Sequence, residues 1–163
     1  MINIQRALFT TLVLFSAALS SGCDKRSPAS SDSQIEPDKT LVRRWIDVGF
    51  NQRAVTIVDE VFKDSVAING VVIPRDGVKQ SMSQHFAAFP DLHVTITRII
   101  GDGKSVGVWY TAEGTHNGPF NGFPATGKHL TWKGADLFIF QDGKVSEASF
   151  LSELPMQLSA AAK

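Results

Sequence analysis

Several common kinds of functional residue are scarce or missing in this 163-residue chain. Its single cysteine, Cys23, excludes an internal disulfide. The formal charge is zero, with 16 basic and 16 acidic residues and no run of lysine or arginine, which excludes the basic surface that nucleic-acid binding needs. The four histidines lack the close paired spacing of a zinc site. We therefore expect neither a nucleic-acid partner nor a metal site.

The N-terminus carries an apolar stretch, residues 7–19, which is shorter than the roughly 20 residues of a membrane-spanning helix. Arg6 precedes this stretch, and the small residues 20–22 follow it. This order of a positive charge, an apolar stretch and small residues is typical of a secretory signal peptide. We interpret residues 1–22 as a signal peptide for export.

Cys23 comes directly after the small residues, a position that resembles a bacterial lipobox. The resemblance implies a lipid on the cysteine, which would anchor the protein on the periplasmic or outer side of a bacterial membrane. The alternative is a soluble secreted protein with an incidental thiol. Residues 23–36 are rich in serine and charge, so we expect a flexible tether there and a single domain at 37–163.

The domain combines helical and strand patterns. Apolar residues at helical spacing predict helices at residues 37–50, 54–62 and 76–89. Residues 65–69, 93–100, 105–116, 129–141 and 144–152 read as strands. Asp102-Gly103 and Asp142-Gly143 are expected hairpin turns. Helices followed by antiparallel strands predict an α+β fold in which helices cover one face of a curved sheet and enclose a pocket.

One acid lies in the apolar phase of the predicted strand at residues 129–141. Asp136 is on the same face of the strand as Leu130, Trp132, Gly134, Phe138 and Phe140, because side chains two residues apart point to the same side. A carboxylate desolvated among apolar side chains has its pKa raised toward neutrality, which suits proton transfer near pH 7. Asp136 is therefore the leading catalytic candidate. The alternatives are an ion pair with Lys133 or Arg98, or a solvated position at a strand end.

Four segments carry a family resemblance: LVRRWIDVGFNQ at 41–52, HFAAFPDLHVTI at 85–96, GTHNGPFNGFPATGK at 114–128 and GADLFIFQDGKV at 134–145. They resemble the SnoaL-like polyketide cyclase or ester cyclase family of the nuclear transport factor 2-like superfamily. The similarity extends over residues 40–158. It implies a cone-shaped, curved antiparallel sheet covered by N-terminal helices. It also implies an enzyme that closes a polyketide ring by an aldol reaction without metal or cofactor.

The resemblance also implies roles for particular residues. Asp136 occupies the place of the family's acid–base aspartate, and a histidine assists in the family. His116 of the GTH motif is our first choice for that histidine and His129 the second. His116 can instead be a turn residue packed under the loop that follows it. We assign His85 and His93 to core or surface packing.

A second group of residues is expected to line the pocket. Tyr110, Trp132, Phe120 and Phe123 would provide aromatic walls for a flat polycyclic or isoprenoid ligand, although each can equally pack in the core. Asn69 would bind a substrate carbonyl or cap the turn before Gly70.

Two functions follow from these residues. The first is a cofactor-independent cyclase or isomerase that acts by acid–base proton transfer on a small hydrophobic carbonyl substrate. The alternative is a non-catalytic envelope lipoprotein that binds a hydrophobic small molecule or a protein partner in the same pocket. A homodimer through the outer face of the sheet is expected by analogy.

Overall fold

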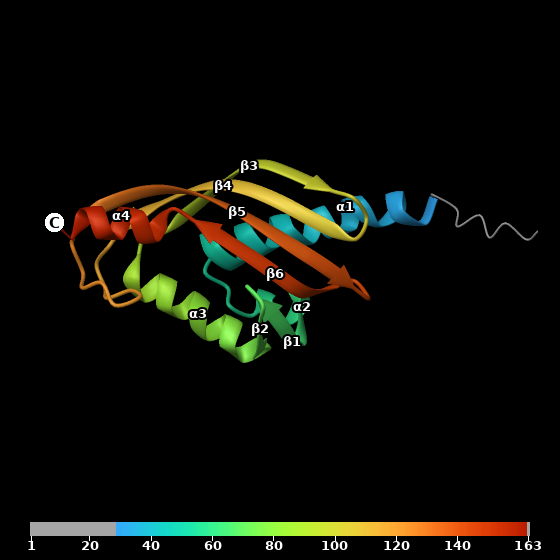
Figure 1. Cartoon of the computed structure of the whole chain (residues 1–163), viewed down its shortest axis with the longest axis horizontal. Helices are drawn as coiled ribbons and strands as arrows, with labels where there is room; N and C mark the ends of the chain where they lie inside the picture. The colour runs from blue at the N-terminus through green and yellow to red at the C-terminus, as the bar shows by residue number, and fades with distance from the viewer. Residues whose placement is uncertain (1–28, 163) are drawn as a thin grey trace, which may run out of the picture.

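The computed structural model describes residues 29–162 (Figure 1). The predicted signal peptide and Cys23 therefore lie outside the described residues. No helix in the described range is both long enough and apolar enough to cross a membrane. The helices are α1 (Ala29–Arg44), the π-helix η1 (Trp45–Asn51), α2 (Ile57–Val61), α3 (Arg75–Ala88) and α4 (Leu154–Ala161). The strands are β1 (Phe62–Ile68), β2 (Val71–Pro74), β3 (His93–Gly101), β4 (Ser105–Thr115), β5 (His129–Gln141) and β6 (Lys144–Ser152).

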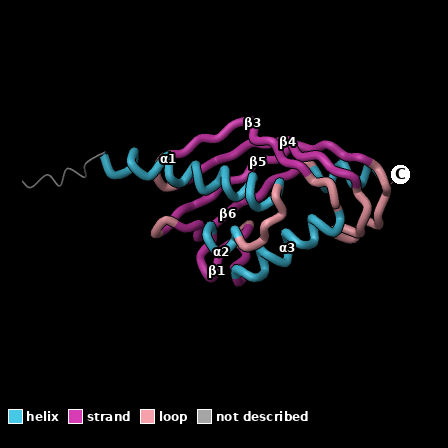
Figure 2. The backbone as a smooth tube through the Cα atoms, turned by 180° about the vertical axis from the view of Figure 1, so that it is seen from behind, coloured by secondary structure: helices cyan, strands magenta, loops and turns pink. Residues whose placement is uncertain are grey.

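The strands form one curved, unclosed six-stranded sheet in the order β2-β1-β6-β5-β4-β3. The helices α1 and α3 lie on its concave side, as Figures 1 and 2 show from opposite directions. This arrangement confirms the predicted α+β class. The predicted antiparallel strands β3 to β6 pair as expected, and the sheet is mixed because β1 runs parallel to β6. No short turn links these two strands, so hairpin geometry does not set their relative direction.

The core lies between the helices and the concave face of the sheet. Val42, Trp45 and Ile46 come from the helical side, and Val108 and Phe138 from the strands, each less than 5% exposed. The alternation predicted for residues 129–141 is confirmed, since Leu137 on the opposite phase is 44% exposed. Burial of side chains of this size contributes about 1.5–3 kcal/mol each. These contacts fix the positions of the strand side chains that point toward the helices.

The first helix begins earlier than the sequence predicted. It starts at Ala29, and Pro37 lies inside it. Ile35 lies beside Gly101 at the end of β3, where a Cβ added to the glycine would be 3.5 Å from the isoleucine side chain. This contact joins the serine-rich segment to the sheet, and the composition of the segment alone gave no sign of it.

The predicted hairpin turns are confirmed. Asp142 and Gly143 have φ angles of 54° and 73°, as a two-residue turn between β5 and β6 requires. Asp102 accepts hydrogen bonds from the backbone N–H groups of Lys104 and Ser105, at 3.0 and 2.8 Å. The strand β2 and the helix α4 were not predicted. Both are short, so their periodicity is weak.

Candidate active site

A row of three residues crosses the concave face of the sheet. Tyr110 of β4 is opposite Gly134 of β5, which is in turn opposite Ser152 of β6. A Cβ on Gly134 would overlap the ring and hydroxyl of Tyr110, so the tyrosine side chain lies directly over the glycine. The absence of a side chain at position 134 therefore lets Tyr110 extend across β5 toward Ser152.

Asp136 lies two residues beyond Gly134 and faces the same space. Its Oδ1 is shielded from solvent and has no hydrogen-bond partner. Burial raises the pKa of Asp136 to about 7, while hydrogen bonding with the Tyr110 hydroxyl and the Leu151 backbone acts in the opposite direction. The carboxyl group is therefore divided between its protonated and ionised forms near neutral pH, as a group that both accepts and returns a proton must be.

The ion pairs considered from the sequence are not formed. No ion pair among the described residues involves Asp136. The Arg98 guanidinium lies over the ring of Trp109, 5.8 Å from its centroid. Lys133 interacts with Glu153 through its backbone N–H, which donates to the glutamate at 3.1 Å. Asp136 is thus a desolvated acid without a counter-charge.

Tyr110 supplies a hydroxyl next to this acid. Burial, and then the charge of the neighbouring Asp136, raise the pKa of Tyr110 above its ordinary value. The phenol therefore keeps its proton at neutral pH and can donate a hydrogen bond. Ser152 is held in turn, because its Oγ accepts a hydrogen bond from the backbone N–H of Leu154 at 3.1 Å.

His85 lies on the helical wall of the same space. Its Nδ1 is 2.8 Å from the carbonyl oxygen of Ser81. A carbonyl oxygen only accepts, so Nδ1 carries the hydrogen. Burial lowers the pKa of His85, which keeps the ring neutral and leaves a lone pair on Nε2. His85 can therefore accept a hydrogen bond or a proton from a bound molecule.

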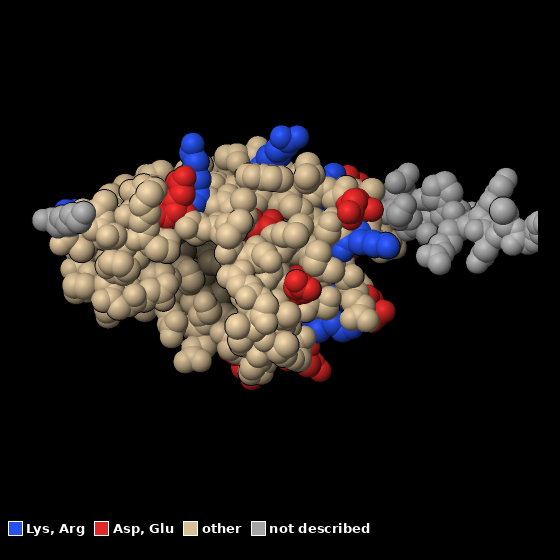
Figure 3. All heavy atoms as spheres, in the orientation of Figure 1, with Lys and Arg blue, Asp and Glu red and all other residues tan. Residues whose placement is uncertain are grey.

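These polar groups meet in a cavity of about 170 Å³ between the helices and the sheet. Apart from Ser81, the rest of its wall is apolar and includes the side chains of Trp45, Phe50, Trp132 and Phe150. In the orientation of Figure 1, the surface is hollowed close to the end of β6 (Figure 3). An apolar cavity with a few convergent polar groups is the usual form of a small-molecule site.

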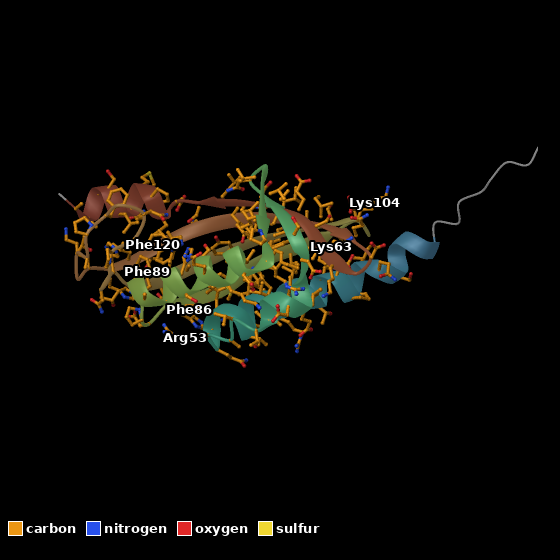
Figure 4. All side chains as sticks on the ribbon, turned by 90° about the horizontal axis from the view of Figure 1, so that it is seen from below. Arg53, Lys63, Phe86, Phe89, Lys104 and Phe120 are labelled. Atoms are coloured by element: carbon orange, nitrogen blue, oxygen red, sulfur yellow. The ribbon has the colours of Figure 1, made fainter. Side chains whose placement is uncertain are left out.

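The predicted aromatic residues separate into two groups. Tyr110 and Trp132 line the cavity together with Asp136. Phe120 and Phe123 instead bond to each other through their backbones, at 3.0 and 2.9 Å, in the loop after β4. Phe120 packs against Phe89, with ring centroids 5.8 Å apart, and both are labelled in Figure 4. It borders a second hollow next to the cavity.

Neither histidine chosen from the sequence is brought together with Asp136. His116 is 0% exposed, lies outside the cavity wall, and stacks on Phe89 at a centroid distance of 5.2 Å. Burial lowers the pKa of His116. His129 is on the surface, with its ring nitrogens 4.0 Å from Asp91 and 3.8 Å from Glu113. The two-residue period of a strand does not predict the direction of the His116 side chain, because β4 ends one residue before it.

Asn69 also lies apart from the cavity. It adopts a φ of 49° in the turn between β1 and β2. Its Oδ1 accepts a hydrogen bond from the backbone N–H of Phe150 at 2.8 Å. Asn69 therefore ties the turn to β6, in line with the turn interpretation rather than with substrate binding.

His85 was missed because the sequence does not distinguish a cavity wall from a packed core. The residue shares a face of α3 with Val78 and Met82, which line the same cavity. A polar residue on this apolar face was the available signal. Within the described residues, no group of three or more histidine, cysteine, aspartate or glutamate side chains is arranged to hold a metal.

Solved structures resemble this chain over most of its length. A protein from Jannaschia sp. CCS1, assigned as a SnoaL-like polyketide cyclase, matches with a TM-score of 0.72 and 21% identity over 79% of this chain and 94% of its own. A SnoaL-like polyketide cyclase from Agrobacterium tumefaciens matches with a TM-score of 0.67 and 15% identity, over 77% and 98%.

A third structure shows that different activities are assigned to this architecture. AclR from Streptomyces galilaeus, assigned as a hydroxylase, matches with a TM-score of 0.65 and 22% identity, over 77% of this chain and 97% of its own. Identities at this level establish the fold alone. The comparison with curated proteins gives no match.

The family model described as SnoaL-like polyketide cyclase matches residues 39–153. This range contains α3, the strands β1 to β6 and every polar residue of the cavity. The chain therefore belongs to the SnoaL-like polyketide cyclase family, with the α+β fold of the nuclear transport factor 2-like superfamily.

Proposed function

We propose that the protein is a cofactor-independent enzyme of the cyclase or isomerase type that moves a proton on a small hydrophobic carbonyl compound. The observation that carries this proposal is the desolvated carboxyl of Asp136 in an apolar cavity, where it has no ion pair and its Oδ1 has no hydrogen-bond partner. A fold devoted to packing alone would gain stability by replacing such an acid, since an unpartnered buried polar group costs about 1–3 kcal/mol.

The geometry supports a two-step transfer. The ionised Asp136 takes a proton from the carbon next to the substrate carbonyl, and the electron pair moves onto the carbonyl oxygen. Tyr110 donates a hydrogen bond to that developing enolate oxygen. The enolate carbon then attacks a second carbonyl of the substrate, or the proton returns to a different carbon. The protonated Asp136 supplies the proton that completes either reaction.

Hydrogen exchange on a probe ketone tests the proposal. Acetophenone in D₂O exchanges its methyl hydrogens for deuterium whenever an enolate forms, and NMR measures the rate. We expect the wild-type protein to accelerate exchange. Exchange with Asp136→Asn should be slower by a factor of about 10²–10⁴, the usual size of general acid–base catalysis. The rate should rise with pH through about 7 as Asp136 ionises.

The matched control is Asp47→Asn, which removes an exposed carboxyl from η1. It should exchange acetophenone at the wild-type rate. If folded Asp136→Asn also exchanges at the wild-type rate, the catalytic proposal fails. Binding of acetophenone by the wild-type protein without any exchange would favour the alternative, a binding protein that uses the same cavity.

The location of the protein is a separate proposal, which rests on the sequence of residues 1–23. We expect the full chain, produced in a Gram-negative host, to incorporate labelled palmitate and to fractionate with membranes. Cys23→Ser should remove both properties while leaving the fold unchanged. Membrane association of Cys23→Ser equal to that of the wild type would contradict lipidation at this residue.

A further inference from the structure

The cavity continues into a second hollow at the surface. This outer hollow has a volume of about 160 Å³ and shares Ser81, His85, Ser152 and Leu154 with the inner cavity. Its remaining wall comes from Gln84, Phe120, Asn121 and Pro155. The four shared residues form a boundary between the two spaces, so a molecule that occupies both lies beside His85 and Ser152.

The two parts differ in chemistry. The inner cavity presents mainly aromatic and aliphatic side chains around Asp136 and Tyr110. The outer hollow adds the amide side chains of Gln84 and Asn121, each of which can both donate and accept hydrogen bonds. A ligand that fills both parts therefore has an apolar end inside and an uncharged polar end outside.

Neither part offers a positive charge. No lysine or arginine is among the residues that line the two hollows, and Asp136 supplies a negative charge when ionised. A carboxylate or phosphate in this space would lose hydration without gaining a counter-ion, which costs several kcal/mol when burial is deep. The lining therefore selects against anionic ligands.

The volume limits the size of the inner part of the ligand. A cavity of about 150 Å³ holds a benzene molecule. The inner cavity, at about 170 Å³, accommodates one six-membered ring with a small carbonyl substituent. The flat polycyclic ligand considered from the sequence would need a larger space.

We propose that the substrate is a neutral carbonyl compound with one ring, placed with its reacting carbon beside Asp136 and its hydroxyl or amide substituent beside Gln84 and Asn121. This inference deepens the proposed function and rests on it for the reacting carbonyl. It assigns the inner cavity to the ring and the outer hollow to substrate recognition.

Three probes of similar shape test this assignment. They are acetophenone, 4-acetylbenzyl alcohol, whose hydroxymethyl group can reach the outer hollow, and the anionic 4-acetylbenzoate. Fluorescence of Trp45 and Trp132, which line the inner cavity, reports binding at pH 8 and does not depend on whether proton exchange occurs. We expect the alcohol to bind at least threefold more tightly than acetophenone, and the carboxylate at least tenfold more weakly than the alcohol.

A charge introduced in the outer hollow gives a matched pair of variants. Gln84→Lys places a cation in the outer hollow and should strengthen binding of 4-acetylbenzoate about tenfold, with little effect on acetophenone. Gln80→Lys places the same charge on an exposed position of α3 that lines neither hollow, and should leave all three affinities unchanged.

The assignment is overturned if the carboxylate binds the wild-type protein as tightly as the alcohol does. It is also overturned if Gln80→Lys and Gln84→Lys act alike, or if no probe binds. The exchange experiment with Asp136→Asn gives an independent result. Loss of exchange together with an unselective binding order would reject the substrate class and leave the proposed function standing.

Discussion

Two buried polar atoms in the described residues have no hydrogen-bond partner, Oδ1 of Asp136 and Nε2 of His116. Both residues were candidates from the sequence. Burial raises the pKa of Asp136 and lowers the pKa of His116, and each shift favours the neutral form of the side chain. Their surroundings differ. Asp136 borders a cavity of about 170 Å³, whereas the ring of His116 is stacked against Phe89 outside the cavity wall.

His116 instead organises the loop that follows β4. Its backbone N–H donates to the carbonyl of Lys128 at 3.0 Å, and its carbonyl accepts from Thr126 and Gly127 at 3.1 and 2.9 Å. Its Nδ1 is 3.3 Å from the Thr126 hydroxyl. The comparison shows that an unpartnered buried atom supports chemistry only where adjacent space admits a ligand to satisfy it.

After Asp136→Asn, the largest effect on exchange that would sharpen this comparison is expected at Gly134. Gly134→Ala introduces a methyl group where the Tyr110 ring and hydroxyl now lie. The tyrosine must move, so the enolate loses a hydrogen bond worth about 1.5–3 kcal/mol, and acetophenone exchange should slow roughly 10–100-fold. Tyr110→Phe, which keeps the ring, should slow exchange to a similar extent.

The control for this variant is Gly107→Ala on β4. A Cβ at that position would have ordinary contacts, with Ile100 and Trp109 as its nearest neighbours at 3.5 Å. Exchange should stay within twofold of the wild type. Unchanged exchange in both folded Gly134→Ala and Tyr110→Phe would remove Tyr110 from the proposed mechanism.

The second prediction concerns stability as a function of pH. The folded-state pKa of Asp136, about 7, lies above its ordinary value of 3.8, so folding favours the protonated acid. The stabilisation is complete below pH 3.8 and is lost as pH rises to about 7. Asp136→Asn cannot ionise at this position. Its stability relative to the wild type should therefore increase by on the order of 4 kcal/mol over this range and stay constant above it.

Urea unfolding at several pH values measures this difference. Asp47→Asn, which removes an exposed carboxyl, serves as the reference for general charge effects. A difference between Asp136→Asn and the wild type that does not change between pH 4 and 7 would mean that Asp136 is solvated in the folded protein.

The smallest effect on activity is expected at His116. His116→Asn removes a ring that packs on Phe89 and should lower the free energy of unfolding by about 1–2 kcal/mol. Acetophenone exchange per folded molecule should remain within twofold of the wild type, because the residue does not reach the cavity. A tenfold loss in the folded variant would restore His116 to the mechanism and break the comparison.

The local patterns of the sequence were enough for part of the site. The two-residue period of β5 placed Asp136 on the apolar face, and the structure has that strand at the predicted residues, His129–Gln141. Tyr110 and Trp132 followed from the same reasoning. His116 and Asn69 did not join them, because both lie at turns, where no strand or helix period determines the direction of a side chain.

The sequence by itself determined the α+β class, the hairpin turns and the inward direction of Asp136, since each depends on residues close together in the chain. Only the tertiary structure decided the parallel pairing of β1 with β6, the position of His85 on the cavity wall, and the path of Tyr110 over Gly134 to Ser152. These features join residues that are distant in the chain, and their geometry depends on how whole elements pack. The physical reason is that local backbone preference acts over a few residues, whereas a cavity exists only between surfaces that folding brings together.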